Sequence, residues 1–318
     1  NYIKVEFSNE IIGYFDELQM HSFSNITSGQ LMHEEAELNK FFNDPLETVF
    51  VPAGRNLITL LSAQLNYIFT SLENSQLRNI DYITKKYTEL ILKMKPMFSH
   101  GVDGIIRDAE NDPIRAKKYG KNRPAITLLL EAASKVLGGK YYYTDNEERL
   151  YLSNGRYVKI NLASSGQQEV IWVFNLLFYY LVEDKKVFLI LEEPESHLYP
   201  SSQEVMAQVL SLMLDSGNSV LVTTHSPYIL GTFNYLLMAQ QVPLEKQDEV
   251  KKKLRKRLWL PAEYTNAYYI HAGQIDSATI VDDGIKIIQN ELIDGASDSI
   301  NEITDFLLGN FYSEEESG

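Results

Sequence analysis

The chain has 318 residues, 44% hydrophobic and 23% charged, which is enough for a large core and for two lobes. Its 43 acidic and 29 basic side chains give a net charge of −14, which excludes a generally cationic binder of nucleic acid or membrane. The absence of cysteine excludes disulfides, thiolate metal sites and thiol catalysis, and it fits a reducing, cytoplasmic setting. The longest apolar run, residues 170–182, is too short to span a bilayer, so no membrane contact is expected.

The N-terminal part of the chain is predicted to be short strands followed by helices. Alternating residues predict a strand over 2–7, and a β-rich run at 48–51 predicts another. Apolar residues at helical spacing predict three helices, over 57–72, 80–94 and 126–137. The intervening residues 101–120 are polar and broken by Gly and Pro, so no helix is expected there.

The central part of the chain changes in character. Turn signals separate three short β-rich runs, at 140–143, 150–152 and 157–160. An apolar helix is then predicted over 167–182. Two continuous apolar runs, 187–191 and 220–223, flank a predicted helix over 202–214 and have the composition of strands buried on both faces of a parallel sheet. This order predicts a βαβ unit, whose ligands bind at the carboxyl ends of the strands.

Two acids and a histidine follow these predicted strands. Glu192 and Glu193 come directly after the run 187–191, and His225 closes the next strand. Adjacent acids are costly there unless a cation or a proton neutralises one of them, and phosphoryl-transfer sites use such acids to hold Mg²⁺ and polarise water. His225 could contact a terminal phosphate or the attacking water. The alternatives are a solvated loop and a structural histidine.

The residues before the predicted apolar helix form a candidate anion site. They read Ala-Ser-Ser-Gly-Gln over 163–167. Ser and Gly at the start of a helix leave free backbone N–H groups at the positive end of the helix dipole. The alternative is an ordinary helix N-cap.

In their order and spacing these segments resemble the motifs of ATP-binding-cassette ATPases. The similar segments are 163–167 (the signature motif, usually Leu-Ser-Gly-Gly-Gln), 187–194 (the Walker B strand), 196–199 (the D-loop) and 224–225 (the switch histidine). Two segments, Glu-Glu-Pro-Glu-Ser-His-Leu-Tyr-Pro and Thr-His-Ser-Pro, are most similar in sequence to the soluble branch of these ATPases. That branch includes structural-maintenance-of-chromosomes (SMC) heads, overcoming-lysogenization-defect ATPases and AAA family ATPases of anti-phage systems. The likeness covers residues 162–228, with a weaker one at 49–55.

The resemblance implies a role for each residue of the predicted sheet edge. Glu193 would be the general base or would orient the attacking water. Glu192 would hold Mg²⁺, usually through a water, although the family normally has the shorter Asp there. His225 would sense the terminal phosphate of ATP.

The resemblance also implies a head-to-tail homodimer, or a higher even-numbered homo-oligomer, with ATP between subunits. The residues that would bind ATP held by the second protomer are Ser164, Ser165, Gly166 and Gln167. The residues that would touch the partner are Ser196, His197 and Tyr199. Arg55 could reach a phosphate or the partner, or it could form an ordinary ion pair.

The family's phosphate-binding loop, Gly-x-x-x-x-Gly-Lys-Ser/Thr (Walker A), is not found in the chain. The nearest match, residues 138–141 (Gly-Gly-Lys-Tyr), lacks the leading Gly and the hydroxyl. In the family this loop lies near the N-terminus, upstream of the strand expected at 2–7, and the first residue here is Asn1 rather than Met. We therefore expect the loop on residues ahead of Asn1. The alternative is a degenerate protein that does not hydrolyse ATP.

The predicted fold class is α/β: a P-loop NTPase sheet core of the cassette type, an inserted helical lobe and an α-rich C-terminal extension. The predicted parts are 1–55 (N-terminal part of the ATPase core), 56–137 (helical lobe), 138–235 (ATPase core with all four motifs) and 236–318 (C-terminal extension). In the extension, Asp282–Asp283–Gly284 is the nearest approach to a metal-nuclease motif, and a turn explains it equally well.

The extension also carries a basic cluster. Its members are Lys251, Lys252, Lys253, Arg255, Lys256 and Arg257. They could hold nucleic-acid phosphates, or they could form a solvated helix face.

The function expected from these observations is hydrolysis of ATP with Mg²⁺ in a head-to-tail dimer. ATP-driven closure would be passed to a separate effector protein, such as a nuclease or toxin, in anti-phage defence. Two alternatives stay open: a nucleotide-sensing scaffold that restrains a toxic effector, and a DNA-repair or SMC-like ATPase that binds DNA through the 251–257 cluster.

Overall fold

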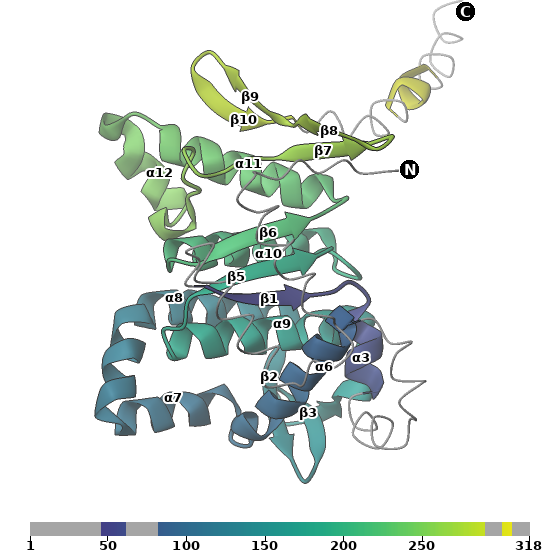
Figure 1. Cartoon of the computed structure of the whole chain (residues 1–318), viewed down its shortest axis with the longest axis vertical. Coiled ribbons are helices and arrows are strands. Elements are labelled where there is room, and N and C mark those ends of the chain that lie inside the picture. The colour runs from purple at the N-terminus through teal and green to yellow at the C-terminus, as the bar shows by residue number, and fades with distance from the viewer. Residues whose placement is uncertain (1–45, 62–81, 290–300, 307–318) are drawn as a thin grey trace, which may run out of the picture.

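The computed structural model describes residues 46–61, 82–289 and 301–306, so the strand expected at 2–7 lies outside it (Figure 1). A three-stranded parallel sheet has the order β1-β5-β6. Its strands are β1 (Glu47–Val51), β5 (Val187–Glu192) and β6 (Ser219–Thr223). Val51 is paired with Leu191, and Glu192 with Thr223, so all three strands end at the same edge.

Burial explains why the run 187–191 is a strand, whereas the expectation that 220–223 is buried is wrong, because β6 has no buried residue and Leu221 is 49% exposed. Val187, Leu189 and Leu191 of β5 are fully buried, and they belong to one continuous apolar core with residues of the helices around the sheet. The two helices of the predicted central part are α9 (Ser165–Val182) and α10 (Pro200–Asp215). Helix α10 joins β5 to its parallel neighbour β6, which confirms the predicted βαβ unit.

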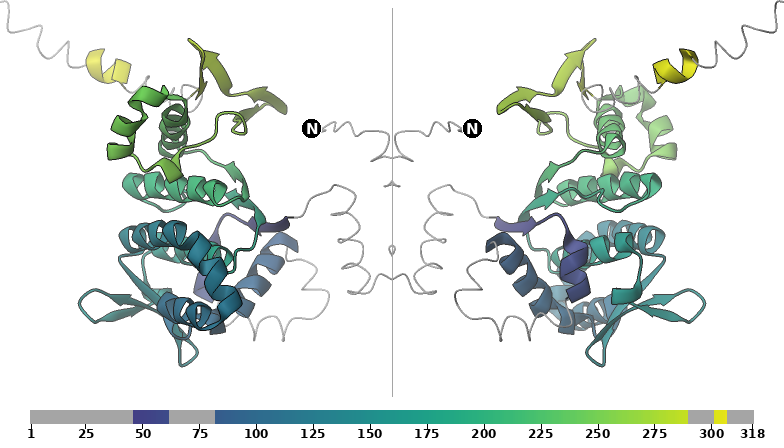
Figure 2. Two further views of the ribbon diagram at one scale, coloured as in Figure 1. Left: turned by 90° about the vertical axis from the view of Figure 1, so that its left-hand side faces the viewer. Right: turned by 90° about the vertical axis from the view of Figure 1, so that its right-hand side faces the viewer.

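Helices dominate the segment between β1 and the small sheet that follows. They are α3 (Arg55–Leu61), α6 (Tyr82–Met94), η2 (Lys95–Phe98), α7 (Gly101–Asn111) and α8 (Pro113–Leu137). Helix α8 packs against both α9 and α10, and Figure 2 shows α8 and α10 one above the other. The core therefore runs without a break from this segment into the parallel sheet.

The expectation that 101–120 holds no helix is wrong. Helices α7 and α8 occupy it and are separated only by Asp112. The Asp112 side chain caps α8 by accepting hydrogen bonds from the N–H groups of Ile114 (2.8 Å) and Arg115 (3.1 Å). Pro113 is at the first helical position, where a missing N–H costs nothing, so it begins a helix rather than breaking one.

The three β-rich runs of the central part are the strands of one antiparallel sheet. Its strands are β2 (Gly139–Thr144), β3 (Glu147–Leu152) and β4 (Tyr157–Lys159), and η3 (Ile160–Leu162) follows. Glu148 of β3 ties this sheet to the core, because it accepts hydrogen bonds from Tyr141 and Trp172 (both 2.9 Å) and pairs with buried Lys95 (2.8 Å). Burial lowers the pKa of Lys95 against the opposing effect of Glu148, and burial raises the pKa of Tyr141.

Among its described residues the C-terminal part is mixed rather than α-rich, because two hairpins follow the helices. After α11 (Pro227–Gln241) come η4 (Leu244–Lys246), α12 (Gln247–Lys253) and η5 (Lys256–Leu258), then two hairpins: β7 (Tyr268–His271) with β8 (Gln274–Ser277), and β9 (Thr279–Asp282) with β10 (Ile285–Ile288). Asp283 and Gly284 form the turn of the second hairpin, both with positive φ, which confirms the turn interpretation of this segment. No helix in the described part of the chain is long and apolar enough to cross a membrane.

Candidate functional site

The ends of β5 and β6 bring the predicted acids and histidine to one edge of the sheet. Glu192 ends β5 beside Thr223, which ends β6, and the N–H of Glu193 donates to the Thr223 carbonyl at 2.9 Å. The loop at 193–199 and the residues that begin with Thr224 therefore leave the sheet side by side. His225 lies two residues beyond β6 and is exposed, as a residue that contacts a ligand requires.

Glu193 has a strained backbone. Its φ is +43°, in the left-handed region that non-glycine residues rarely occupy. Its Oε2 accepts a hydrogen bond from Ser196 Oγ at 3.1 Å, and the N–H of Ser196 donates to the Glu193 carbonyl at 3.1 Å. Ser196, expected at the partner contact, is thus engaged by Glu193 of its own chain. His197 and Tyr199 are exposed, Tyr199 to 76%.

Glu195 connects the 193–199 loop to the histidine. Its Oε1 accepts hydrogen bonds from Thr224 Oγ1 (2.8 Å) and from the N–H of His225 (2.7 Å). Its Oε2 is buried and has no hydrogen-bond partner among the residues that the structure describes. Sequence reasoning passed over this residue, although it is the third acid of the Glu-Glu-Pro-Glu run.

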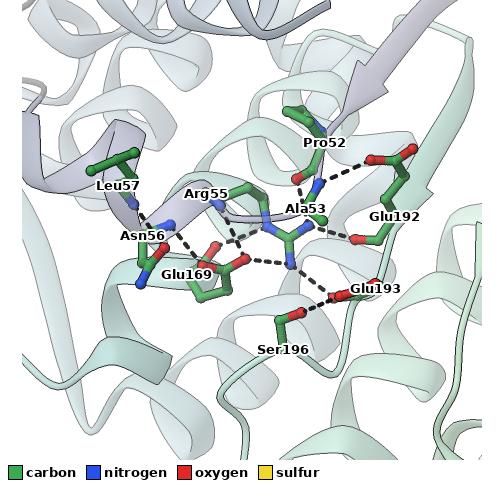
Figure 3. A network of polar contacts seen from close by, with 9 residues as sticks. All are labelled: Pro52, Ala53, Arg55, Asn56, Leu57, Glu169, Glu192, Glu193 and Ser196. Carbon is green, nitrogen blue, oxygen red and sulfur yellow. Dashed lines mark hydrogen bonds and ion pairs between the residues drawn. The ribbon is translucent and has the colours of Figure 1, made fainter.

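Arg55 lies at the centre of a buried network that also involves both predicted acids (Figure 3). Its side chain is 0% exposed and points inward. Nη1 donates to the carbonyls of Pro52 (2.8 Å) and Glu192 (2.6 Å). Nη2 donates to the carbonyl of Glu193 (3.1 Å). The ion-pair interpretation of Arg55 is therefore confirmed, and the guanidinium is buried inside the chain.

Glu169 supplies the anionic half of this network from within α9. Its Oε1 is 3.2 Å from Arg55 Nη2, and its backbone carbonyl accepts from Arg55 Nε at 3.2 Å. Its carboxylate also accepts the N–H groups of Arg55 (3.1 Å) and Asn56 (2.6 Å), which begin α3. Burial raises the pKa of nearby Tyr87, with Arg55 lowering it and Glu169 raising it by smaller amounts. Nothing in the sequence pattern pointed to Glu169.

One carboxylate oxygen of Glu192 accepts a hydrogen bond from the backbone. This arrangement suits a metal ion that keeps several water ligands. Its Oε2 accepts the N–H of Ala53 at 3.1 Å, from the loop that follows β1. Within 46–61, 82–289 and 301–306 no three His, Asp or Glu side chains form a metal cluster. One oriented carboxylate fits Mg²⁺, which is usually held by one or two carboxylates together with substrate phosphates.

The predicted signature segment begins α9 as a capped helix. Ser164 Oγ accepts the Gln167 N–H (3.3 Å), while Gln167 Oε1 accepts the Ser164 N–H (3.0 Å). Gln167 Nε2 donates to the Leu137 carbonyl at 2.7 Å, so its side chain is used within the chain. Ser164 and Ser165 are exposed.

The start of α9 touches the 193–199 loop. A Cβ built on Gly166 would be 2.7 Å from the His197 carbonyl oxygen, so only glycine fits at this approach. The exposed tip of α9, Ser164 and Ser165, therefore lies next to the loop that carries Glu193. The structure brings the predicted signature and the predicted Walker B loop together in one protomer.

Three members of the basic cluster are neutralised by acids of the same chain. The pairs are Lys251 with Asp248 (2.7 Å), Arg255 with Glu131 (3.0 Å) and Arg257 with Asp215 (2.7 Å). Lys252 and Lys253 are exposed on α12, and Lys256 Nζ lies 6.0 Å from the centre of the Trp259 ring. Nucleic-acid contact through this cluster stays a prediction.

The comparison with known families agrees with this geometry. The model of the AAA ATPase domain family matches residues 3–230, which include the sheet edge, the signature segment and Arg55. No curated protein and no solved structure matches the chain. Since the match covers well over half of the chain, the protein belongs to the AAA ATPase domain family.

Proposed function

We propose that this ATPase hydrolyses ATP to ADP and phosphate with Glu193 as the base. The observation that supports this most is the convergence of Glu192, Glu193 and the His225 loop at the carboxyl edge of β5 and β6. Such an edge is where parallel α/β sheets bind nucleotides. Membership of an ATPase family supports ATP as the nucleotide.

The proposed chemical step follows from the orientation of the Glu193 carboxylate. Its Oε2 is oriented by Ser196, so its carboxylate can accept a proton from a water that attacks the terminal phosphorus of ATP. The new phosphorus–oxygen bond forms as the bond to the ADP oxygen breaks, and the proton passes from the water to Glu193 and then to solvent. His225, held through its backbone by Glu195, would contact the terminal phosphate.

Glu192 would hold the magnesium ion that ATPases of this family generally use. Bound Mg²⁺ neutralises charge that develops on the phosphate oxygens. The Ala53 N–H fixes one carboxylate oxygen of Glu192 and so presets the direction of the side chain. This restraint offsets the freedom that the extra methylene of Glu gives relative to Asp.

A head-to-tail dimer would complete the site. The exposure of Ser164 and Ser165 at the start of α9 supports this, because a helix tip that closes on a partner's nucleotide must be accessible. Exposed His197 and Tyr199 beside that tip would lie at the same contact. A higher even-numbered assembly would repeat this contact.

ATP-driven closure of the dimer would be passed to a separate effector protein in anti-phage defence. The exposed apolar residues of the hairpins support a partner surface, and they lie beyond the residues that match the family. They are Tyr268, Ile270, Ile275 and Val281. The defence setting rests on the resemblance of the motifs to anti-phage ATPases.

The test is phosphate release by the purified full-length protein. We expect Glu193→Gln to lower turnover by about 10²-fold or more, because it removes the general base. The matched control is Glu110→Gln, an exposed residue of α7, which should keep wild-type turnover. ATP binding without phosphate release by the wild type would favour the scaffold alternative. Equal turnover in both variants would contradict the role of Glu193.

A further inference from the structure

Helix α9 and the 193–199 loop are joined at two points in the same protomer. At the first, Gly166 packs against the backbone of His197. At the second, Arg55 bridges Glu169 of α9 to the carbonyls that flank the start of the loop. The loop that carries Glu193 is thus fixed to the first two turns of the helix whose tip is the signature segment.

The second joint uses the whole guanidinium of Arg55. Four hydrogen bonds and one ion pair account for its five N–H groups, with partners in α9, at the end of β5 and in the loops that follow β1 and β5 (Figure 3). Its contacts with Glu192 and Glu193 are at 2.6 and 3.1 Å. The planar guanidinium can donate to all of these acceptors at once. The single ammonium group of lysine cannot, so lysine cannot replace Arg55.

The two ends of this joint belong to different nucleotide sites if the proposed dimer holds. The tip of α9 would close on ATP bound by the partner, whereas Glu193 would act on ATP bound by its own protomer. A contact between them inside one protomer would therefore link the two sites of the dimer. Because such linkage is mutual for binding, each ATP would strengthen the binding of the other.

We propose that Arg55 and Glu169 are positioning residues that transmit closure at the tip of α9 to Glu193 of the same protomer. This inference rests on the proposed function. Glu193 holds a left-handed backbone, which persists only when its surroundings enforce it. The Arg55 contacts to the carbonyls of Glu192 and Glu193 are one such restraint, and they move with α9 because Glu169 holds the guanidinium.

The stability of the fold does not by itself require a buried ion pair such as Arg55–Glu169. Replacing such a pair by apolar residues of similar volume is often neutral or stabilising. The double variant Arg55→Met with Glu169→Leu should therefore fold, while it loses every contact to the Glu192 and Glu193 carbonyls. This variant separates a structural role from a coupling role.

The experiment measures phosphate release against ATP concentration in the full-length protein, together with hydrogen exchange of residues 193–199. We expect the Hill coefficient to fall from about 2 in the wild type to about 1 in the double variant, because two sites allow no more than two. Exchange of the loop should rise about tenfold in Arg55→Lys, Glu169→Gln and the double variant. The control is Glu183→Gln at the other end of α9, where Glu183 pairs with Arg115 at 2.6 Å, and it should behave as wild type.

Two results would overturn the coupling. One is a wild-type Hill coefficient near one, and the other is a folded double variant with unchanged cooperativity and unchanged loop exchange. Neither result bears on Glu193 as the base. The proposed function fails separately, when the wild type releases no phosphate or when Glu193→Gln keeps full turnover.

Discussion

Gly166 is the residue where the start of α9 and the 193–199 loop come closest. Gly166→Ala would put a methyl group 2.7 Å from the His197 carbonyl oxygen, so the loop must move. We predict a loss of turnover of about 10²-fold, since a shift of about 1 Å at a catalytic group costs this much. The matched control is Gly120→Ala in α8, where nothing lies within 4 Å, and it should keep turnover and add up to about 1 kcal/mol of stability. Full activity in Gly166→Ala would show that the approach is not functional.

Glu195 is the residue that holds the histidine loop. Glu195→Ala removes the acceptor of Thr224 Oγ1 and of the His225 N–H, so the histidine loop loses two hydrogen bonds to a carboxylate. We predict that kcat falls about tenfold or more and that exchange of the His225 amide rises. Glu195→Gln keeps one acceptor oxygen and should retain most of the activity. An Ala variant with an unchanged His225 amide would refute this role.

The sequence alone identified the site residues that come at the end of a predicted strand. It did not identify Arg55 and Glu169, which hold the site through contacts with backbone groups. Glu192, Glu193 and His225 are visible because an apolar run sets their place at the sheet edge. Arg55 and Glu169 are 114 positions apart in the chain, and their meeting depends on how α3 packs on α9. No local pattern carries that information, so only the folded chain reveals the network.

The end of α9 offers a test at the scale of elements. Asp184 follows α9 and accepts hydrogen bonds from Lys121 (2.8 Å), Lys186 (2.7 Å) and Asn122 (3.0 Å). Burial alone would raise the pKa of Asp184, but these bonds lower it well below its usual range. Its contribution to stability is therefore present above the unfolded pKa and is lost as the pH falls through and below about 4.

We predict that Asp184→Asn lowers the free energy of unfolding at neutral pH and flattens its decline on acidification. Denaturant unfolding followed from pH 7 to pH 3 measures both effects. The exposed Asp108 on α7 provides the control, since Asp108→Asn should leave the profile nearly unchanged. A parallel acid profile for wild type and Asp184→Asn would exclude this contribution.

The elements themselves were predictable to different degrees. Strands β5 and β6 were found because each is a short, continuous apolar run, although only β5 has buried residues. Helix α7 and the first half of α8 were missed because Gly and Pro were taken as breakers, whereas Pro113 after the Asp112 cap is a start signal. The hairpin of β9 and β10 carries an Asp-Gly turn, which is a strong sequence signal that the expectation of an α-rich extension left unused.

At the scale of the whole molecule, the proposed dimer would use each protomer in two different nucleotide sites. The exposed tip at Ser164 and Ser165 and the edge at Glu192 and Glu193 lie on the same part of the surface, next to the 193–199 loop. In the proposed dimer, a second copy would supply the helix tip that closes on each nucleotide, so the proposal requires an assembly.

The most direct measurement of this claim is the mass of full-length Glu193→Gln in solution with and without ATP. We predict a monomer without nucleotide and a stable dimer with ATP, because the variant binds ATP but cannot cleave it. Adding Ser165→Arg in the same chain should abolish the dimer, since a bulky cation at the exposed tip prevents closure on the partner's nucleotide. A protein that binds ATP yet stays monomeric at concentrations well above its ATP affinity would contradict the account.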